Sequence, residues 1–243
     1  MAQLQKLEAC YNYRKLAPAD DSWYEVSSGS IPVLVSAPHA CMHRRDKLGK
    51  MEEEFTGAIA QYLSDAAKCH SISTVYQSPE DPNWHTDSEY KRAIAGLHRQ
   101  YNFKLVIDLH GMLNRHQMGV AVGTIRNQSC DAKEIVPAFT RAGFIVAQST
   151  ESKSKNSDDV NWRKLVVDHP RFTGGVRNHT VTRFVSEQLG IPAVQIELAS
   201  VARVVYSPPT DDWPQSYSGD EAAIAASVHA LQGLVEMHAC GPC

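Results

Sequence analysis

Apolar positions along the chain recur at two spacings, and their alternation predicts a succession of strands and helices. Short runs rich in β-branched residues predict strands at 31–36, 71–76, 104–110, 119–125, 144–148 and 193–198. Apolar residues that recur every three or four positions predict helices at 52–68, 88–101, 179–189 and 219–238. Pro137 is expected to start or kink one more helix between the strands at 119–125 and 144–148.

Strands that alternate with helices indicate an α/β protein with a mainly parallel sheet. The run 104–110 has a near-continuous apolar centre, which is typical of a strand covered on both faces. No shift in composition marks a boundary, so we expect one domain over residues 1–243, with a core at about 31–238. Residues 151–162 are polar and aperiodic, and we expect a mobile loop there.

Composition and charge narrow the class of protein. The 243 residues are 43% hydrophobic and 21% charged, and 24 Lys and Arg against 27 Asp and Glu give a net charge of −3. Nucleic-acid binders usually carry a basic excess, so no nucleic-acid partner is expected. The sequence contains neither an apolar run long enough for a membrane span nor a secretory signal at its start, so we expect a cytoplasmic protein.

The cysteines do not add a site to this picture. The six cysteines are scattered, and without an export signal we expect reduced thiols. Cys240 and Cys243 form a C-x-x-C pair at the end of the sequence, which could be a redox dithiol or half of a zinc site. No second C-x-x-C completes a zinc site, so the pair is interpreted as a frayed tail.

Residues with catalytic chemistry fall near the carboxyl ends of three predicted strands, where open α/β sheets bind their ligands. These residues are His39, His110 and Glu197. Two imidazoles and a carboxylate are typical ligands of a catalytic Zn²⁺. The third ligand would come from the Glu cluster at 52–54, which the helical pattern places at the start of a helix.

Most of these residues also have a simpler, structural explanation. A single histidine after a strand is more often a surface or core residue than a ligand, and acidic residues often open a helix because its dipole favours them. Glu197 is the exception, because a carboxylate buried in an apolar strand needs a cation, a donor or a proton. Arg45, Arg177 and Arg203 could each bind a substrate carboxylate through the guanidinium fork, or be surface charges.

Five segments together resemble the N-formylglutamate amidohydrolase family. They are VSAPHACMHRRD (35–46), EEFTG (53–57), DPNW (81–84), VIDLHGM (106–112) and GIPAVQIEL (190–198). The chain has Ala40-Cys41 where family members usually have Ser-Gly or Gly-Gly after the histidine, so it resembles a divergent member. The family is similar in fold to zinc carboxypeptidases and aspartoacylase, which implies a three-layer α/β/α sandwich of the phosphorylase/hydrolase type.

The resemblance implies a zinc ion held by His39, Glu53 and His110, with Glu54 as the alternative acidic ligand. It also implies that Glu197 is the catalytic carboxylate, and we assign Asn83 of the DPNW segment to substrate binding.

The expected function is zinc-dependent hydrolysis of the amide C–N bond of a small N-acyl or N-formyl amino acid that carries a carboxylate. The alternative is an inactive family member that serves as a small-molecule binding or scaffold protein.

Overall fold

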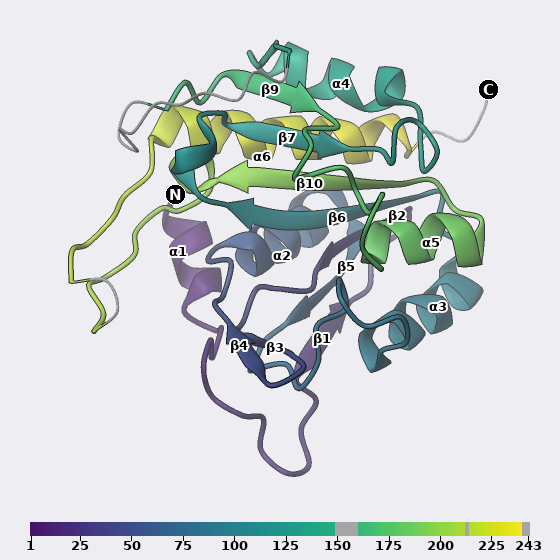
Figure 1. Cartoon of the computed structure of the whole chain (residues 1–243), viewed down its shortest axis with the longest axis vertical. Helices are drawn as coiled ribbons and strands as arrows, with labels where there is room; N and C mark the ends of the chain where they lie inside the picture. The colour runs from purple at the N-terminus through teal and green to yellow at the C-terminus, as the bar shows by residue number, and fades with distance from the viewer. Residues whose placement is uncertain (149–159, 212–213, 240–243) are drawn as a thin grey trace.

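A mixed sheet of eight strands lies at the centre of the computed structural model, which describes residues 1–148, 160–211 and 214–239 (Figure 1). In spatial order the strands are β1 (Tyr24–Ser27), β5 (Cys69–Thr74), β2 (Ile31–Ala37), β6 (Leu105–Met112), β10 (Ala193–Ala199), β7 (Val120–Gly123), β9 (Lys164–Val167) and β8 (Ile145–Val146). The β1–β5 and β10–β7 pairs are antiparallel and the other neighbours are parallel. The predicted α/β class is therefore confirmed.

Helices cover both faces of this sheet. One face carries α3 (Glu89–Tyr101) and α5 (Val181–Leu189), and the other carries α1 (Ala2–Glu8), α2 (Thr56–Ala67), α4 (Ala132–Arg141) and α6 (Glu221–Met237) (Figure 1). Successive strand residues point to opposite faces. In β2, Val33 and Val35 accordingly pack with α2 and Leu34 with α3. Apolar side chains on both faces of the central strands produce the three-layer sandwich.

The helix ends follow from local chemistry. The side chains of Ser88, Asp131, Thr180 and Asp220 each accept a backbone N–H from the first turn of the helix that follows. Gly190, with φ 67°, ends α5 in the left-handed conformation that glycine tolerates. Pro137 lies inside α4. These caps explain why the predicted starts of α3, α5 and α6 agree with the observed ones to within two residues.

The sequence placed the acidic cluster wrongly with respect to its helix. The prediction was a helix over 52–68, but α2 begins only at Thr56, because Phe55 precedes it with a positive φ of 65°. Glu53 and Glu54 therefore lie on a turn before the helix. The strand predicted to end near His110 also continues to Met112, so His110 is part of β6.

Several short elements were not predicted. They are α1, β1, β9, the hairpin of β3 (His43–Arg45) and β4 (Leu48–Lys50), and the 3₁₀ turns Asn114–His116 and Ser200–Ala202. Strands of three or four residues contain too few positions to display a period. The loop predicted at 151–162 falls largely outside the described residues, as do Cys240 and Cys243. Among the described helices, none is both long and apolar enough to cross a bilayer.

Candidate metal centre and substrate cavity

The central strands β6 and β10 bring the predicted site residues together. These strands are parallel, and Glu197 lies directly opposite His110 in their register. Leu109 and Leu198 pack into the core with α2 and α6, so the alternation turns His110 and Glu197 toward the opposite face. His39 follows the end of β2, the strand on the other side of β6.

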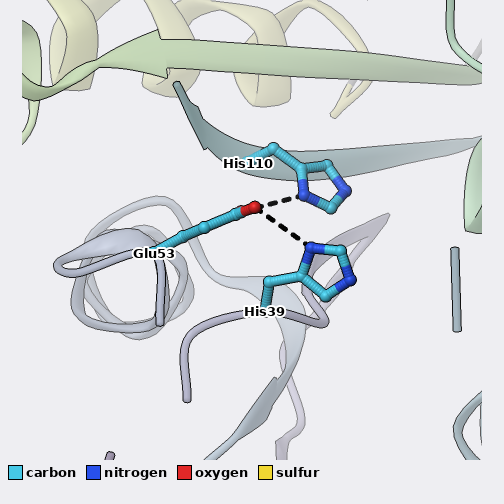
Figure 2. A group of neighbouring side chains, drawn as sticks. All are labelled: His39, Glu53 and His110. Atoms are coloured by element: carbon cyan, nitrogen blue, oxygen red, sulfur yellow. Dashed lines mark hydrogen bonds and ion pairs between the residues drawn. The ribbon is translucent and has the colours of Figure 1, made fainter. Parts of the chain in front are cut away.

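Glu53 joins the two histidines (Figure 2). Its Oε1 lies 3.1 Å from Nδ1 of His39, and its Oε2 lies 2.9 Å from Nδ1 of His110. The same Oε2 accepts the backbone N–H of Gly111 at 2.9 Å. One ligand atom from each of the three residues lies within 4.8 Å of the other two, so the three side chains could bind one ion. The His39 and His110 side chains are almost fully buried.

The outer nitrogens of both imidazoles also face polar partners. Nε2 of His39 is 2.9 Å from Oδ1 of Asp81, and Nε2 of His110 is 3.2 Å from Oδ1 of Asp108. The amide nitrogen of Asn83 is 2.8 Å from the same Nε2 of His110. The amide oxygen of Asn83 accepts the backbone N–H of Val181 at 2.8 Å, which fixes the orientation of the amide. Asn83 lines the cavity, but its side chain supports His110.

The carboxylates around the two histidines stabilise positive charge in the site. Burial disfavours the charged imidazole of His39, but Glu53 and Asp81 outweigh burial and raise its pKa to about 9. Burial likewise opposes a charged His110, yet Asp108 and Glu53 hold its pKa well above the ordinary value. Burial would raise the pKa of Glu53, but the two histidines lower it well below its usual range. The pocket is thus built for a cation beside an ionised Glu53.

A divalent metal ion fits this donor set. Two inward Nδ1 atoms and one carboxylate are ordinary Zn²⁺ ligands, and three protein ligands are typical of a catalytic site. Metal-binding histidines usually donate their other ring N–H to a carboxylate, as Asp81 is placed to accept from His39 here. The surrounding carboxylates favour positive charge at His39 and His110. A bound metal ion would supply that charge in place of the protons on the two imidazoles.

A second group of possible ligands is less suitable. His39, His43 and Asp81 also lie within 4.8 Å of one another, and the two imidazole rings stack at 3.7 Å. However, this group shares His39 with the first, and Asp81 already accepts Nε of Arg45 at 2.8 Å. A guanidinium there would repel a cation. Asp81 is better described as the carboxylate that orients His39.

Glu197 has the environment of a catalytic base. Its side chain is only 7% exposed and lines the same cavity as His39, Glu53 and His110. Within the described part of the chain, its carboxylate has no hydrogen bond or ion pair. Burial is the main cause that raises its pKa to about 7, with His110 opposing and Glu53 adding to the rise. A carboxyl group tuned to this range can both accept and return a proton near neutral pH.

The cavity beside these residues is large enough for a small molecule and is rich in arginine. Its volume is about 400 Å³, and its wall includes Arg45, Arg126, Arg171 and Arg177. Arg45 is paired with Asp81, whereas the other three make no ion pair with the described residues. Of the arginines predicted to bind substrate, Arg45 and Arg177 line the cavity. Arg203 does not, because its buried guanidinium donates to the backbone oxygens of Glu54 and Leu198.

The sequence did not identify Arg126 and Arg171 as cavity residues. Arg126 lies in a left-handed turn in which Ile125, Arg126 and Asn127 have φ values of 52°, 57° and 62°. The carboxylate of Asp168 holds this turn through the N–H and hydroxyl of Thr124, at 2.8 and 2.7 Å. Arg171 lies in the irregular segment between β9 and α5. The only sequence signal for Arg126 is its place directly after the strand predicted at 119–125, which many arginines share, and Arg171 has none because β9 was not predicted.

Comparison with solved structures identifies the fold. An N-formylglutamate amidohydrolase from Ralstonia eutropha JMP134 aligns with a TM-score of 0.56 and 10% identity, over 89% of this chain and 98% of its own. A gene product from Agrobacterium tumefaciens aligns with a TM-score of 0.51 and 11% identity, over 96% and 98%. The protein shares the fold of these two structures. At these identities the likeness establishes the architecture alone.

Comparisons at the level of sequence add no assignment. No protein-family profile matches the chain, and no curated protein matches it.

A third solved structure is less similar. A metallo-carboxypeptidase from Pseudomonas aeruginosa aligns with 9% identity over 92% of this chain and 59% of its own, and its TM-score of 0.45 is too low to support an argument. The function therefore has to be argued from the site itself.

Proposed function

We propose that the protein is a zinc-dependent amidohydrolase that cleaves the amide C–N bond of a small N-acyl or N-formyl amino acid. The observation that carries the proposal is the position of Glu53 between the Nδ1 atoms of His39 and His110, with the carboxylate of Glu197, which has no ion pair with a described residue, in the same cavity. A metal-binding triad beside a carboxylate is an arrangement that can activate water for hydrolysis of an amide.

His39, Glu53 and His110 would hold the ion. When bound, Zn²⁺ lowers the pKa of a water molecule and polarises the acyl oxygen of the substrate. Glu197 takes a proton from the attacking water and then delivers it to the nitrogen of the leaving amine. Asp81 keeps the imidazole of His39 oriented, and Asn83 and Asp108 lie beside Nε2 of His110.

The substrate is expected to carry a carboxylate. Arg126, Arg171 and Arg177 line the cavity without ion pairs to the described residues, and a guanidinium binds a carboxylate through two parallel hydrogen bonds. The cavity of about 400 Å³ suits an acylated amino acid rather than a folded protein.

The deciding experiment combines metal analysis with a substrate screen. Full-length protein purified without added zinc is analysed for metal content, beside His110→Ala. Metal-replete protein is then incubated with N-formyl, N-acetyl and longer N-acyl amino acids, with a chelated sample as the control. We expect about one zinc per chain, lost in His110→Ala, and amine release that stops on chelation. A wild-type protein that binds no metal would rule out this function.

A binding or scaffold protein is the second candidate. The same cavity and arginines would hold an acidic small molecule without turnover. In that case the protein binds N-acyl amino acids in calorimetry, but it releases no amine at any metal loading. The expected absence of nucleic-acid partners and the expected cytoplasmic location remain predictions from the sequence.

Asp81 offers a test of the outer carboxylates. We expect Asp81→Asn to weaken zinc binding by about 10- to 100-fold, because the neutral amide no longer fixes His39 or increases its basicity. The dissociation constant is measured by competition with a chromophoric chelator. Asp65→Asn, on the exposed face of α2, is the control and should bind zinc as the wild type does. Unchanged affinity in Asp81→Asn would contradict the role given to Asp81.

Arg177 offers a test of substrate recognition. We expect Arg177→Ala to raise KM for a carboxylate-bearing substrate about tenfold or more, since a hydrogen bond to a charged group contributes about 1.5–3 kcal/mol. The effect should disappear with the corresponding substrate in which an amide replaces the carboxylate. Arg99→Ala, on the exposed surface of α3, is the control. Equal losses on both substrates would assign Arg177 a structural role.

A further inference from the structure

The turn that carries Glu53 adopts a backbone conformation that its own sequence does not favour. Phe55, a bulky residue that is 3% exposed, has φ 65° and ψ −4°. Residues with side chains of this size rarely adopt the left-handed region, and they do so only where the surroundings hold them. Within the turn, Thr56 donates its hydroxyl to the backbone oxygen of Glu53 at 2.7 Å. The remaining support comes from distant parts of the chain.

Arg203 holds the turn from the side of the sheet. Its side chain comes from the segment after β10, and the residue is only 5% exposed. Nη1 donates to the backbone oxygen of Glu54, and Nε donates to the backbone oxygen of Leu198 at 3.2 Å. One buried guanidinium therefore links the end of β10 to the residue after Glu53. Because the guanidinium is buried and donates to both backbone oxygens, it can hold the turn at a fixed distance from the end of β10.

Gly111 allows Arg203 to lie against the strand that carries His110. A Cβ on Gly111 would lie 2.5 Å from Nε and 2.6 Å from Cζ of Arg203, so only glycine leaves room for the guanidinium. The backbone N–H of Gly111 in turn donates to Oε2 of Glu53. The Arg203 guanidinium and the Glu53 carboxylate thus both lie against Gly111, the residue that follows His110 in β6.

Glu8 holds the turn from the opposite side. This residue ends α1, and its Oε1 accepts the backbone N–H of Phe55 at 2.5 Å and the hydroxyl of Tyr13. The other oxygen, Oε2, is buried and has no hydrogen-bond partner among the residues that the structure describes. Burial raises the pKa of this carboxyl group to about 7, and Arg203 is among the charges that lower it. The buried carboxyl group of Glu8 therefore holds the backbone N–H of Phe55.

We propose that Arg203 and Glu8 are positioning residues that clamp residues 53–55 and hold the Glu53 carboxylate where it can bind metal together with His39 and His110. The inference rests on the proposed metal site. It makes the N-terminal helix and the segment after β10 parts of the metal centre, although neither touches the ion. Glu53 belongs to no helix or strand, so its accuracy as a ligand depends on this clamp.

The experiment measures zinc affinity in full-length protein, by competition with a chromophoric chelator, beside thermal unfolding of the metal-free protein. Arg203→Met and Glu8→Ala each remove one side of the clamp, and Arg203→Lys and Glu8→Gln restore one donor or acceptor. The matched control is Arg14→Met, because Arg14 pairs with the side chain of the neighbouring Glu52 at 3.1 Å. We expect a zinc dissociation constant about 10- to 100-fold higher in Arg203→Met and Glu8→Ala, as for other residues that orient ligands.

The conservative variants should recover at least part of this loss, and Arg14→Met should bind zinc as tightly as the wild type. Folded variants Arg203→Met and Glu8→Ala that bind zinc with wild-type affinity would overturn the clamp while leaving the metal site intact. Should Arg203→Met fail to fold, Glu8→Ala decides the question alone, since Glu8 lies at the end of a peripheral helix. A wild-type protein that binds no zinc would instead reject the proposed function.

Discussion

Replacing Glu197 by glutamine is expected to lower kcat by about 10²- to 10⁴-fold while the zinc content stays at the wild-type level, the range that general acid–base catalysis contributes. Glutamine keeps the size of the side chain and its place in β10 opposite His110. It cannot accept a proton from water or return one to the amine. Since Glu197 is not one of the three proposed ligands, its replacement should affect turnover and leave metal binding unchanged.

The measurement pairs steady-state kinetics on the substrate found in the screen with metal analysis of the same samples. Glu187→Gln is the matched control, because Glu187 lies exposed on α5 and pairs with Arg183 at 2.9 Å. We expect this control to be indistinguishable from the wild type. Wild-type turnover in Glu197→Gln would remove the base from the mechanism. A parallel loss of zinc would instead show that Glu197 supports the metal.

Much of the site could be predicted because strand alternation and strand ends are readable in a sequence. His110 and Glu197 lie in long apolar strands, where a polar residue stands out against its neighbours. His39 lies two residues beyond the end of such a strand. These three residues lie in or just after strands whose burial the hydrophobic pattern indicates, and the structure places all three on one cavity.

Residues outside regular elements were harder to place. The acidic cluster at 52–54 was interpreted as the first turn of a helix, but Phe55 has a positive φ, and its backbone N–H is bound by Glu8, which is distant in sequence. Arg203 was predicted to bind substrate because its guanidinium suits a carboxylate. No local pattern could show that Gly111 leaves space for it to reach the backbone of Glu54. Such contacts depend on tertiary structure, which periodicity does not report.

The acidic cluster also provides the most direct test of the metal centre, because neighbouring glutamates have different partners. Glu53 faces both histidines, whereas Oε1 of Glu54 accepts the hydroxyl of Ser207 at 2.6 Å. We expect Glu53→Gln to abolish zinc binding and turnover, since an amide replaces the one anionic ligand. Glu54→Gln should retain both, because it keeps the backbone oxygen that Arg203 binds.

Thermal unfolding with and without zinc distinguishes these variants without a known substrate. A ligand that binds only the folded state at 100 times its dissociation constant adds about 2.7 kcal/mol to the free energy of unfolding. Wild-type protein and Glu54→Gln should therefore melt at a higher temperature when zinc is added, and Glu53→Gln should not. If the zinc-dependent rise is lost in Glu54→Gln and kept in Glu53→Gln, the acidic ligand is Glu54, and the side chain seen between the two imidazoles is not the one that binds metal. If both variants keep the rise, neither glutamate is required, and the metal centre at His39 and His110 needs a different third ligand.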